Sequence, residues 1–511
     1  MNNWRVLAEQ GKKIRLCGGT RTRQEAWLLD CLKRNQSSAY LMKYGVDVRT
    51  SLDDFRKRLP LVTYDDLTKY VKRVECGEEN ILFVGMPIAF ERTSGSSGGN
   101  KLIPYTSDSL ADFQGGILPW LADVVDGYGI ETGCAYWSIS PATRPMEITP
   151  AGVHVGLPDG AYLGNDVIES FVELSAVPPW VGSIQSVDAW KVCTLYWLLC
   201  RSDLALISVW SPTFLLMLLD ALESEHKNLL SLLEQGGNIG GHELPPNAHA
   251  LNRLIAYSST QDARALWPAL KLVSCWADAS SKPYFNELKI RLPQAQFQGK
   301  GLLSTEGIGT VPDKSGRPVL AVDSGFFEFL DAQEVSCFAW ELQNGSHYEM
   351  VMTTSGGLYR YRTGDIVQCE GYTGDLPILR FLGRKGLASD IVGEKLTEQF
   401  VAACLDDVRG FRMLVPHVQG KPKYVLITDK RINVDRETLA ASLEMRLSQN
   451  VQYGYARRIG QMDAVEVLSV EAPLKLFMER MTHSGTRLGD IKVPSLRPEA
   501  DWLTTFQGNA Q

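Results

Sequence analysis

Residues 188–277 alternate between segments with helical periodicity and short apolar runs, and this alternation strongly constrains the fold. The predicted elements are helices at 188–200 and 212–224 and buried strands at 205–210 and 270–277. Ser211 and Pro212 suit the N-cap and the first position of the second helix. Helices that alternate with buried strands form a layer over a largely parallel sheet, so we predict an α/β fold.

The two ends of the chain have a different pattern. Residues up to about Cys76 are rich in charge and helical periodicity, which predicts a helical beginning. Beyond residue 390 the predicted elements are helices at 394–406 and 435–448 and strands at 423–428 and 463–470. We therefore predict a large N-terminal domain of mostly parallel sheets and helices at 1–384, a hinge at 385–390 and a small α+β domain at 391–511.

Composition indicates a globular protein with a small-molecule partner. The 511 residues carry a net charge of −7, which argues against a general nucleic-acid or anionic-membrane surface. The ten cysteines form no CxxC pair and no Cys/His set with metal-ligand spacing, so we expect reduced thiols. The N-terminus lacks the apolar core of a signal peptide, and the apolar stretch at 204–219 is too interrupted to span a bilayer, so we expect a cytoplasmic protein.

A loop rich in glycine and hydroxyl side chains follows an apolar run at 81–90 that we predict as a buried strand. The loop residues are Ser94, Gly95, Ser96, Ser97, Gly98 and Gly99, and Lys101 follows them. Glycines let several N–H groups converge, and the lysine adds a positive charge, so the loop is a candidate polyphosphate site. No Ser or Thr follows the lysine as in a P-loop, and a flexible linker is the alternative interpretation.

Two further motifs occur later in the chain. Ser304-Thr305-Glu306 follows a strand-like segment, and Tyr361-Arg362-Thr363-Gly364-Asp365 follows a Gly-Gly turn. Alone, the first is more often a helix cap and the second a turn, and Arg362 could be only an ion-pair partner. In this order, with Gly383-Arg384 and a small C-terminal domain behind them, they describe an adenylate-forming enzyme.

The chain resembles the auxin-responsive acyl-acid amido synthetases, the Gretchen Hagen family of plant enzymes and bacterial relatives, within the adenylate-forming superfamily of firefly luciferase type. The segments that carry the resemblance are 58–67, 101–104, 195–200, 267–268, 347–365 and 485–494. The resemblance implies that an acid and ATP give acyl-AMP and pyrophosphate, and that an amine, usually an amino acid, then displaces AMP.

The resemblance also implies roles for single residues. Lys101 and the loop would stabilise the leaving pyrophosphate, and Glu306 would hold Mg²⁺. Asp365 would accept hydrogen bonds from the ribose hydroxyls, with Arg384 near the ribose or α-phosphate. Lys395 and Lys492 match family lysines that approach the nucleotide phosphate and the active site, although Lys492 could equally be a solvated loop lysine. Ser304, Thr305 and Tyr361 are further candidate nucleotide-binding residues, although Tyr361 also suits sheet packing.

The sequence departs from the family pattern in two places. The phosphate loop is one residue shorter than in the plant enzymes. Leu302 replaces the family's aromatic residue four positions before the glutamate, so adenine stacking must come from elsewhere or be weaker.

Two other functions compete with amide synthesis. An acyl-CoA ligase shares the first step, but the chain has Gly-Asp-Ile-Lys-Val-Pro in place of the ligase Gly-Lys-x-x-Arg pattern. A non-catalytic nucleotide-binding homologue is less consistent with retention of Lys101, Glu306 and Asp365. Because the two steps make different demands on one site, we expect the small domain to turn about 384–390, and a proline at Leu387 to impair at least one half-reaction.

Overall fold

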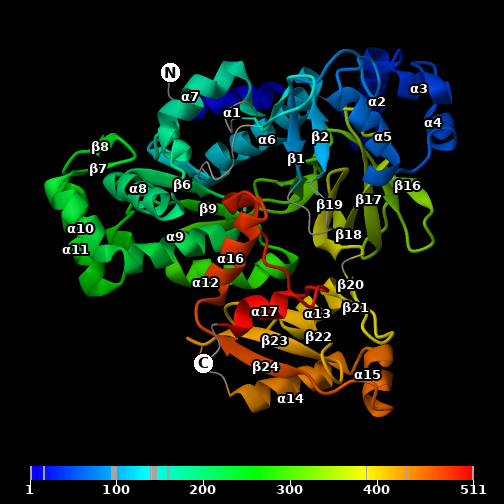
Figure 1. Cartoon of the computed structure of the whole chain (residues 1–511). Helices are drawn as coiled ribbons and strands as arrows, with labels where there is room; N and C mark the ends of the chain where they lie inside the picture. The colour runs from blue at the N-terminus through cyan, green and yellow to red at the C-terminus, as the bar shows by residue number, and fades with distance from the viewer. Residues whose placement is uncertain are drawn as a thin grey trace.

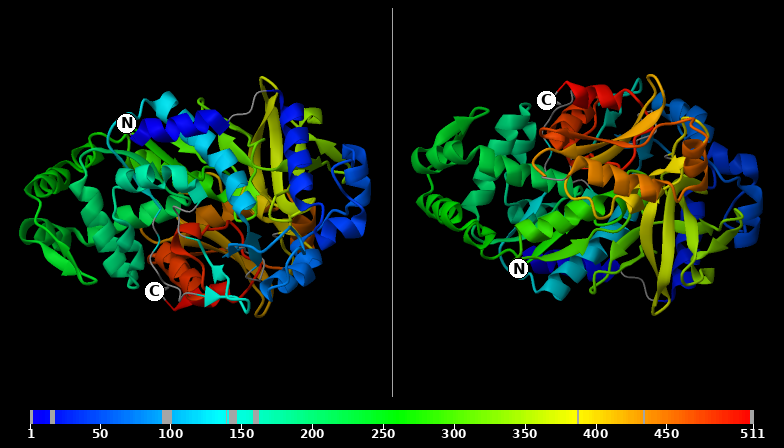
Figure 2. Two further views of the ribbon diagram at one scale, coloured as in Figure 1. Left: turned by 90° about the horizontal axis from the view of Figure 1, so that it is seen from above. Right: turned by 90° about the horizontal axis from the view of Figure 1, so that it is seen from below.

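The computed structural model describes residues 3–14, 18–93, 101–138, 140, 147–157, 162–386, 388–432 and 435–508. The chain begins with helices, as predicted: α1 (Asn3–Ile14), α2 (Thr20–Asn35), α3 (Ala39–Tyr44), α4 (Leu52–Arg58) and α5 (Tyr64–Glu75). The α3–α4 region and the α10–α11 pair (His226–Gln235, Ala248–Thr260) lie at opposite ends of the long axis of the molecule (Figure 2). None of the described helices has both the length and the apolar composition needed to cross a membrane.

A parallel four-stranded sheet in the order β10-β9-β6-β3 confirms the α/β fold. Its strands are β3 (Cys134–Trp137), β6 (Leu204–Ser208), β9 (Leu272–Cys275) and β10 (Gln296–Gly299). Helices α8 (Val187–Cys200), α9 (Pro212–Ser224) and α12 (Lys282–Arg291) pack on the face that presents Ile207 and Val273. Helix α6 (Ser107–Tyr128), with α1 and α7 (Asn165–Leu174), packs on the face that presents Leu206 and Leu272. Burial on both faces explains why these strands are continuous apolar runs.

The predicted strand at 81–90 is largely wrong. Strand β1 covers only Ala89–Arg92, and it belongs to a small mixed sheet, β2-β1-β5-β4, with β2 (Leu102–Tyr105), β4 (Glu147–Ile148) and β5 (His154–Val155). The preceding apolar residues enter the core as a turn: the Asn80 side chain accepts a hydrogen bond from the Gly85 N–H at 2.8 Å, and Leu82 and Phe83 are buried. Apolar burial without strand pairing therefore produced the strand-like pattern.

A seven-stranded antiparallel sheet, β13-β14-β19-β18-β17-β15-β16, carries the central motif. Its strands are β13 (Thr310–Pro312), β14 (Pro318–Leu320), β15 (Phe326–Leu330), β16 (Ser336–Phe338), β17 (His347–Thr353), β18 (Tyr361–Thr373) and β19 (Leu376–Arg384). In the β18–β19 pairing Asp365 lies opposite Arg384. The short hairpin β11 (Leu303–Ser304) and β12 (Gly307–Ile308) places Glu306 in its turn.

The residues after 387 build a smaller α+β unit beneath the two large sheets (Figure 1). Its three-stranded sheet has the order β22-β23-β24, and its elements are β20 (Ala388–Ser389), β21 (Leu396–Thr397), α13 (Glu398–Cys404), β22 (Arg412–His417), β23 (Lys423–Asp429), α14 (Arg436–Leu447), α15 (Val451–Arg458), β24 (Glu466–Val470), α16 (Pro473–His483) and α17 (Trp502–Gln507). One face of this sheet packs on α13 and α14, and the other joins α16, α17 and the core around α12.

From the sequence, the glycines and adjacent prolines of 235–246 predict a surface loop. The structure instead has an exposed antiparallel hairpin there, formed by β7 (Gly237–Ile239) and β8 (His242–Leu244). Glycines at its turn produced the loop prediction.

Candidate functional site

Glu306 lies at the turn of the β11–β12 hairpin and is 7% exposed. The Tyr105 hydroxyl donates to the Thr305 carbonyl at 2.7 Å and so ties this turn to β2. The Tyr361 hydroxyl donates to the Glu306 carboxylate at 3.4 Å, which brings the second and third sequence motifs together. The Ser304 hydroxyl is used within the hairpin, where it donates to the Gly307 carbonyl at 3.2 Å.

Asp365 and Arg384 form an ion pair on adjacent strands, with 3.3 Å between Arg384 Nε and Asp365 Oδ1. Burial raises the pKa of Asp365, and the guanidinium of Arg384 acts in the opposite direction. The negative charge of Asp365, joined by that of Glu306 and by Tyr361, raises the pKa of Arg384. Four of the predicted site residues therefore share one electrostatic environment.

Lys492 reaches this environment from the C-terminal unit. Its backbone neighbours Ile491 and Val493 are buried, whereas its own side chain is exposed. The ammonium lies 4.0 Å from the centroid of the Trp276 ring and interacts electrostatically with Asp365. This lysine is therefore not an isolated surface lysine: it faces the site and remains open to solvent.

Lys101 stands at the end of the candidate phosphate loop. It is half-buried, with its ammonium 5.6 Å from the centroid of the Tyr64 ring. The Thr93 N–H donates to the Lys101 carbonyl at 3.0 Å. The residues on either side of the loop are therefore joined by a hydrogen bond at the end of the β1–β2 hairpin. The other predicted members, Ser94, Gly95, Ser96, Ser97, Gly98 and Gly99, lie outside the described residues.

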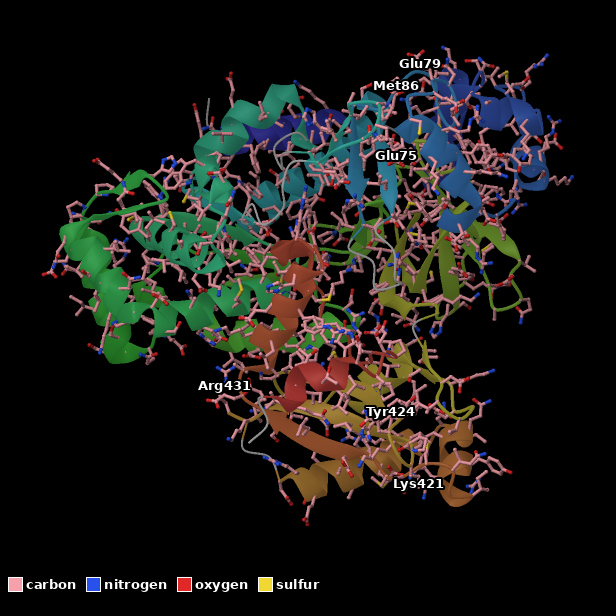
Figure 3. All side chains as sticks on the ribbon, viewed as in Figure 1. Glu75, Glu79, Met86, Lys421, Tyr424 and Arg431 are labelled. Carbon is pink, nitrogen blue, oxygen red and sulfur yellow. The ribbon has the colours of Figure 1, made fainter. Side chains whose placement is uncertain are left out.

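Lys395 makes no hydrogen bond or ion pair with the described residues of this cluster. It is exposed, has a φ of 48°, and its side chain makes no hydrogen bond or ion pair with a described residue. The neighbouring Glu394 is fully buried and holds the loop, because it accepts the N–H groups of Ile391 and Val392 at 2.8 Å and the hydroxyl of Tyr424. Figure 3 shows Tyr424 within the C-terminal unit.

Arg362 is an ion-pair residue. It bonds to Glu349 at 2.6 Å and to Glu334 at 2.9 Å, and Lys385 bonds to the same two carboxylates. Burial opposes ionisation of Glu349, but hydrogen bonds from both cations lower its pKa overall. This network joins β17, β18 and the residue directly after β19.

Leu302 is a core residue. Its side chain is 7% exposed and packs in the cluster beneath the seven-stranded sheet. Its N–H donates to the Thr310 hydroxyl at 2.8 Å. The position of the family's aromatic residue therefore contributes to packing in this chain.

A cavity of about 20 Å³ adjoins Glu306. That volume holds about one water molecule. Asp112, Ser109 and Thr354 are among the polar residues that line it. Burial raises the pKa of Asp112 to about 7, although Ser355 donates both its N–H and its hydroxyl to this carboxyl group.

Four residues around the cluster are not among the predicted site residues: Trp276, Lys300, Arg487 and Gly489. Arg487 lies 3.8 Å from Glu91, which also accepts the Tyr162 hydroxyl at 2.6 Å. The Gly489 N–H donates to the Ser140 hydroxyl at 3.1 Å. A lysine or tryptophan directly after a buried strand is a signal that could have identified Lys300 and Trp276.

Comparison with known proteins gives matches over most of the chain. Residues 15–297 match the family model described as GH3 family N-terminal domain, and residues 318–384 match GH3 family central domain. The chain is 25% identical over 540 aligned positions to indole-3-acetic acid-amido synthetase GH3.8 of Oryza sativa subsp. indica, with 92% of this chain and 87% of the relative covered.

Solved structures share the fold at lower sequence identity. AtGH3.15 acyl acid amido synthetase in complex with 2,4-DB superposes with a TM-score of 0.85 at 20% identity, over 96% of this chain and 94% of that chain. A 2-hydroxyisobutyryl-CoA ligase in the postadenylation state superposes with a TM-score of 0.58 at 14% identity, over 94% of this chain and 89% of the ligase.

Proposed function

Because this chain belongs to the GH3 (Gretchen Hagen) family, we propose that it is an ATP-dependent acyl-acid amido synthetase, an AMP- and pyrophosphate-forming carbon–nitrogen ligase. The observation that supports this most directly is the convergence of Glu306, Tyr361, Asp365, Arg384 and Lys492, which come from three separate stretches of sequence. The names of the amido synthetase relatives support the same class of reaction.

In the first step, a carboxylate oxygen of the acid forms a bond to the α-phosphorus of ATP, and the bond from that phosphorus to the bridging oxygen breaks. Pyrophosphate leaves with additional negative charge. We assign the stabilisation of this charge to the cations Lys101, Arg384 and Lys492, and the N–H groups and hydroxyls of 94–99 would add donors. Electrostatic stabilisation of this leaving group is the main contribution we assign to the chain's own residues.

The ribose site is assigned to Asp365. A carboxylate can accept hydrogen bonds from both hydroxyls of a diol. Arg384 holds Asp365 from the neighbouring strand and opposes the effect of burial on its pKa, so the carboxyl group remains a better acceptor at neutral pH. Tyr361 stands between this pair and Glu306.

Glu306 suits Mg²⁺ as a single protein ligand. Magnesium keeps several waters and binds through one or two carboxylates together with substrate phosphates. Among the described residues, no group of three or more His, Cys, Asp or Glu side chains is arranged to hold a metal ion. When bound, the ion would neutralise phosphate charge, and the buried Glu306 would fix its position.

In the second step, the amine nitrogen bonds to the acyl carbon, the carbon–oxygen bond to AMP breaks, and the amine proton passes to solvent. We propose that 391–511 acts as a small domain that turns about a hinge at 385–390 relative to 1–384, so that the amine can enter after pyrophosphate leaves. Support comes from Lys492 and Arg487, which reach the site from the far side of this hinge. Leu387, within the hinge, lies outside the described residues.

The proposal is tested by ATP-dependent pyrophosphate release against a panel of aryl and alkyl acids, with and without pooled amino acids, and with products read by mass. We expect pyrophosphate release with at least one acid and an amide mass only when an amino acid is present. A thioester on addition of CoA, without an amide, would move the assignment to an acyl-CoA ligase. ATP binding without pyrophosphate release for any acid would indicate a non-catalytic homologue.

A further inference from the structure

Lys300 is a buried lysine that has no carboxylate partner among the described residues. It follows β10 directly and is 6% exposed. Its ammonium donates to the Ser208 hydroxyl at 2.6 Å, and no described Asp or Glu lies within ion-pair distance. An ammonium has three N–H donors, so two of them have no acceptor among the described side chains and carbonyls.

Two tryptophan rings lie beside the ammonium of Lys300. The ammonium lies 4.6 Å from the centroid of Trp120 and 5.2 Å from that of Trp210. Cation–π contacts offset only part of the cost of burying a charge. Burial lowers the pKa of Lys300 to about 7. Methionine or leucine would fill this position without the cost of burying a charge. Packing alone therefore does not explain a lysine here, whereas binding of an anionic ligand does.

The position of Lys300 in the sheet points to the same conclusion. Ser208, Trp276 and Lys300 end or directly follow the parallel strands β6, β9 and β10, and ligands of open parallel sheets bind at this carboxyl edge. Trp210 and Trp276 lie side by side with ring centroids 6.2 Å apart, and both are half-buried. Lys492 contacts the Trp276 end of this pair, and Lys300 contacts the Trp210 end.

We propose that Lys300 binds a second carboxylate on the acyl part of the acid, so that the enzyme activates dicarboxylic acids whose apolar body lies along Trp210 and Trp276. This inference rests on the proposed function. The carboxylate that reacts lies on the Lys492 side, and the distal carboxylate pairs with the ammonium of Lys300 and replaces the missing acceptors. Lys300 is thus a residue that determines specificity.

The test compares monocarboxylic and dicarboxylic acids of equal chain length in the wild type, K300M and K300Q. We expect the wild type to prefer the dicarboxylic acid, and both variants to lose about tenfold to a hundredfold in kcat/KM for it, with little change for the monocarboxylic acid. K289M is the matched control, because Lys289 is exposed and lies 4.7 Å from the centroid of Phe285, away from the sheet edge.

Calorimetric binding of the same acids without ATP separates this inference from the proposed function. The titrations are repeated at pH 8 in buffers with different heats of ionisation, which measures the number of protons taken up on binding. The wild type should take up protons when the dicarboxylic acid binds, because the bound anion favours the charged form of Lys300. The variants should show weaker binding and no uptake. Two results would overturn the inference, whether or not pyrophosphate is released. One is equal affinity of the wild type for both acids, and the other is an unchanged preference for the dicarboxylic acid in folded K300M and K300Q.

Discussion

Asp365 combines burial, an ion pair and a place beside Glu306 and Tyr361. We predict that D365N lowers the affinity for ATP by about tenfold to a hundredfold, because the amide presents one acceptor to the ribose diol and leaves Arg384 without its anion. Equilibrium titration with ATP, followed by pyrophosphate release, measures the effect. D188N, at an exposed carboxylate on α8, serves as the control, and equal affinities in D365N and D188N would contradict the ribose assignment.

We predict that Asp112 makes the free energy of unfolding depend on pH. Its pKa is raised from 3.8 to about 7, so the folded state binds this proton more tightly than the unfolded state. The resulting loss of stability therefore begins near pH 4, grows as pH rises and is complete above about pH 7, with an upper size of about 4 kcal/mol. Urea unfolding of D112N should show a smaller loss between pH 4 and pH 7 than the wild type. Parallel profiles would show that another group is responsible.

At the scale of single strands, the carboxylate of Glu349 links β17 to Arg362 on β18 and to Lys385 after β19. We predict that E349Q lowers the free energy of unfolding by about 3 kcal/mol, because it leaves two cations beside a buried neutral group. E334Q removes an exposed carboxylate that bonds to the same two cations, and should be much milder. Chemical unfolding of both variants measures the difference, and similar losses would be inconsistent with the buried pair being dominant.

Helices and strands with a clear pattern of apolar residues were predictable from the sequence. The helix at Pro212–Ser224 and the strand at Leu272–Cys275 combine strong apolar patterns with cap or turn residues, and the structure confirms both. The apolar run at 81–88 failed because burial in a turn and burial in a strand give the same composition. The hairpin at 237–244 was missed because its short strands are exposed and lack alternation.

Members of the candidate site were predictable where they lie in a recognisable sequence motif. Glu306 and Asp365 interact electrostatically. Tyr361, at the start of β18, donates to Glu306 in the β11–β12 turn, and Asp365, farther along β18, pairs with Arg384 on β19. Lys300 gave no motif, because its significance depends on the lack of a carboxylate partner among the described residues and on tryptophans distant in sequence. The role of Lys395 stays a prediction, and its position could not be read from the sequence, since the fold of its loop is set by Glu394 and Tyr424.

At the scale of the whole molecule, the contact between Gly489 and Ser140 allows the proposed domain turn to be tested. A Cβ added at Gly489 would lie 2.8 Å from the Ser140 hydroxyl oxygen, close to the geometry of a disulfide. We predict that oxidised S140C/G489C releases pyrophosphate but forms little amide, and that reduction restores amide synthesis. The single variants under the same oxidant are the controls. Amide synthesis at an unchanged rate in the fully oxidised protein would refute the turn.

The contact of Lys492 with Trp276 also has an optical consequence. An ammonium 4.0 Å from an indole ring changes the electric field that sets the ring's emission wavelength and intensity. If the C-terminal unit carries Lys492 away during turnover, the emission of Trp276 changes with it. In that case Trp276 fluorescence would report the position of the C-terminal unit, and the difference between wild-type and W276F emission would isolate that signal in real time without an added dye.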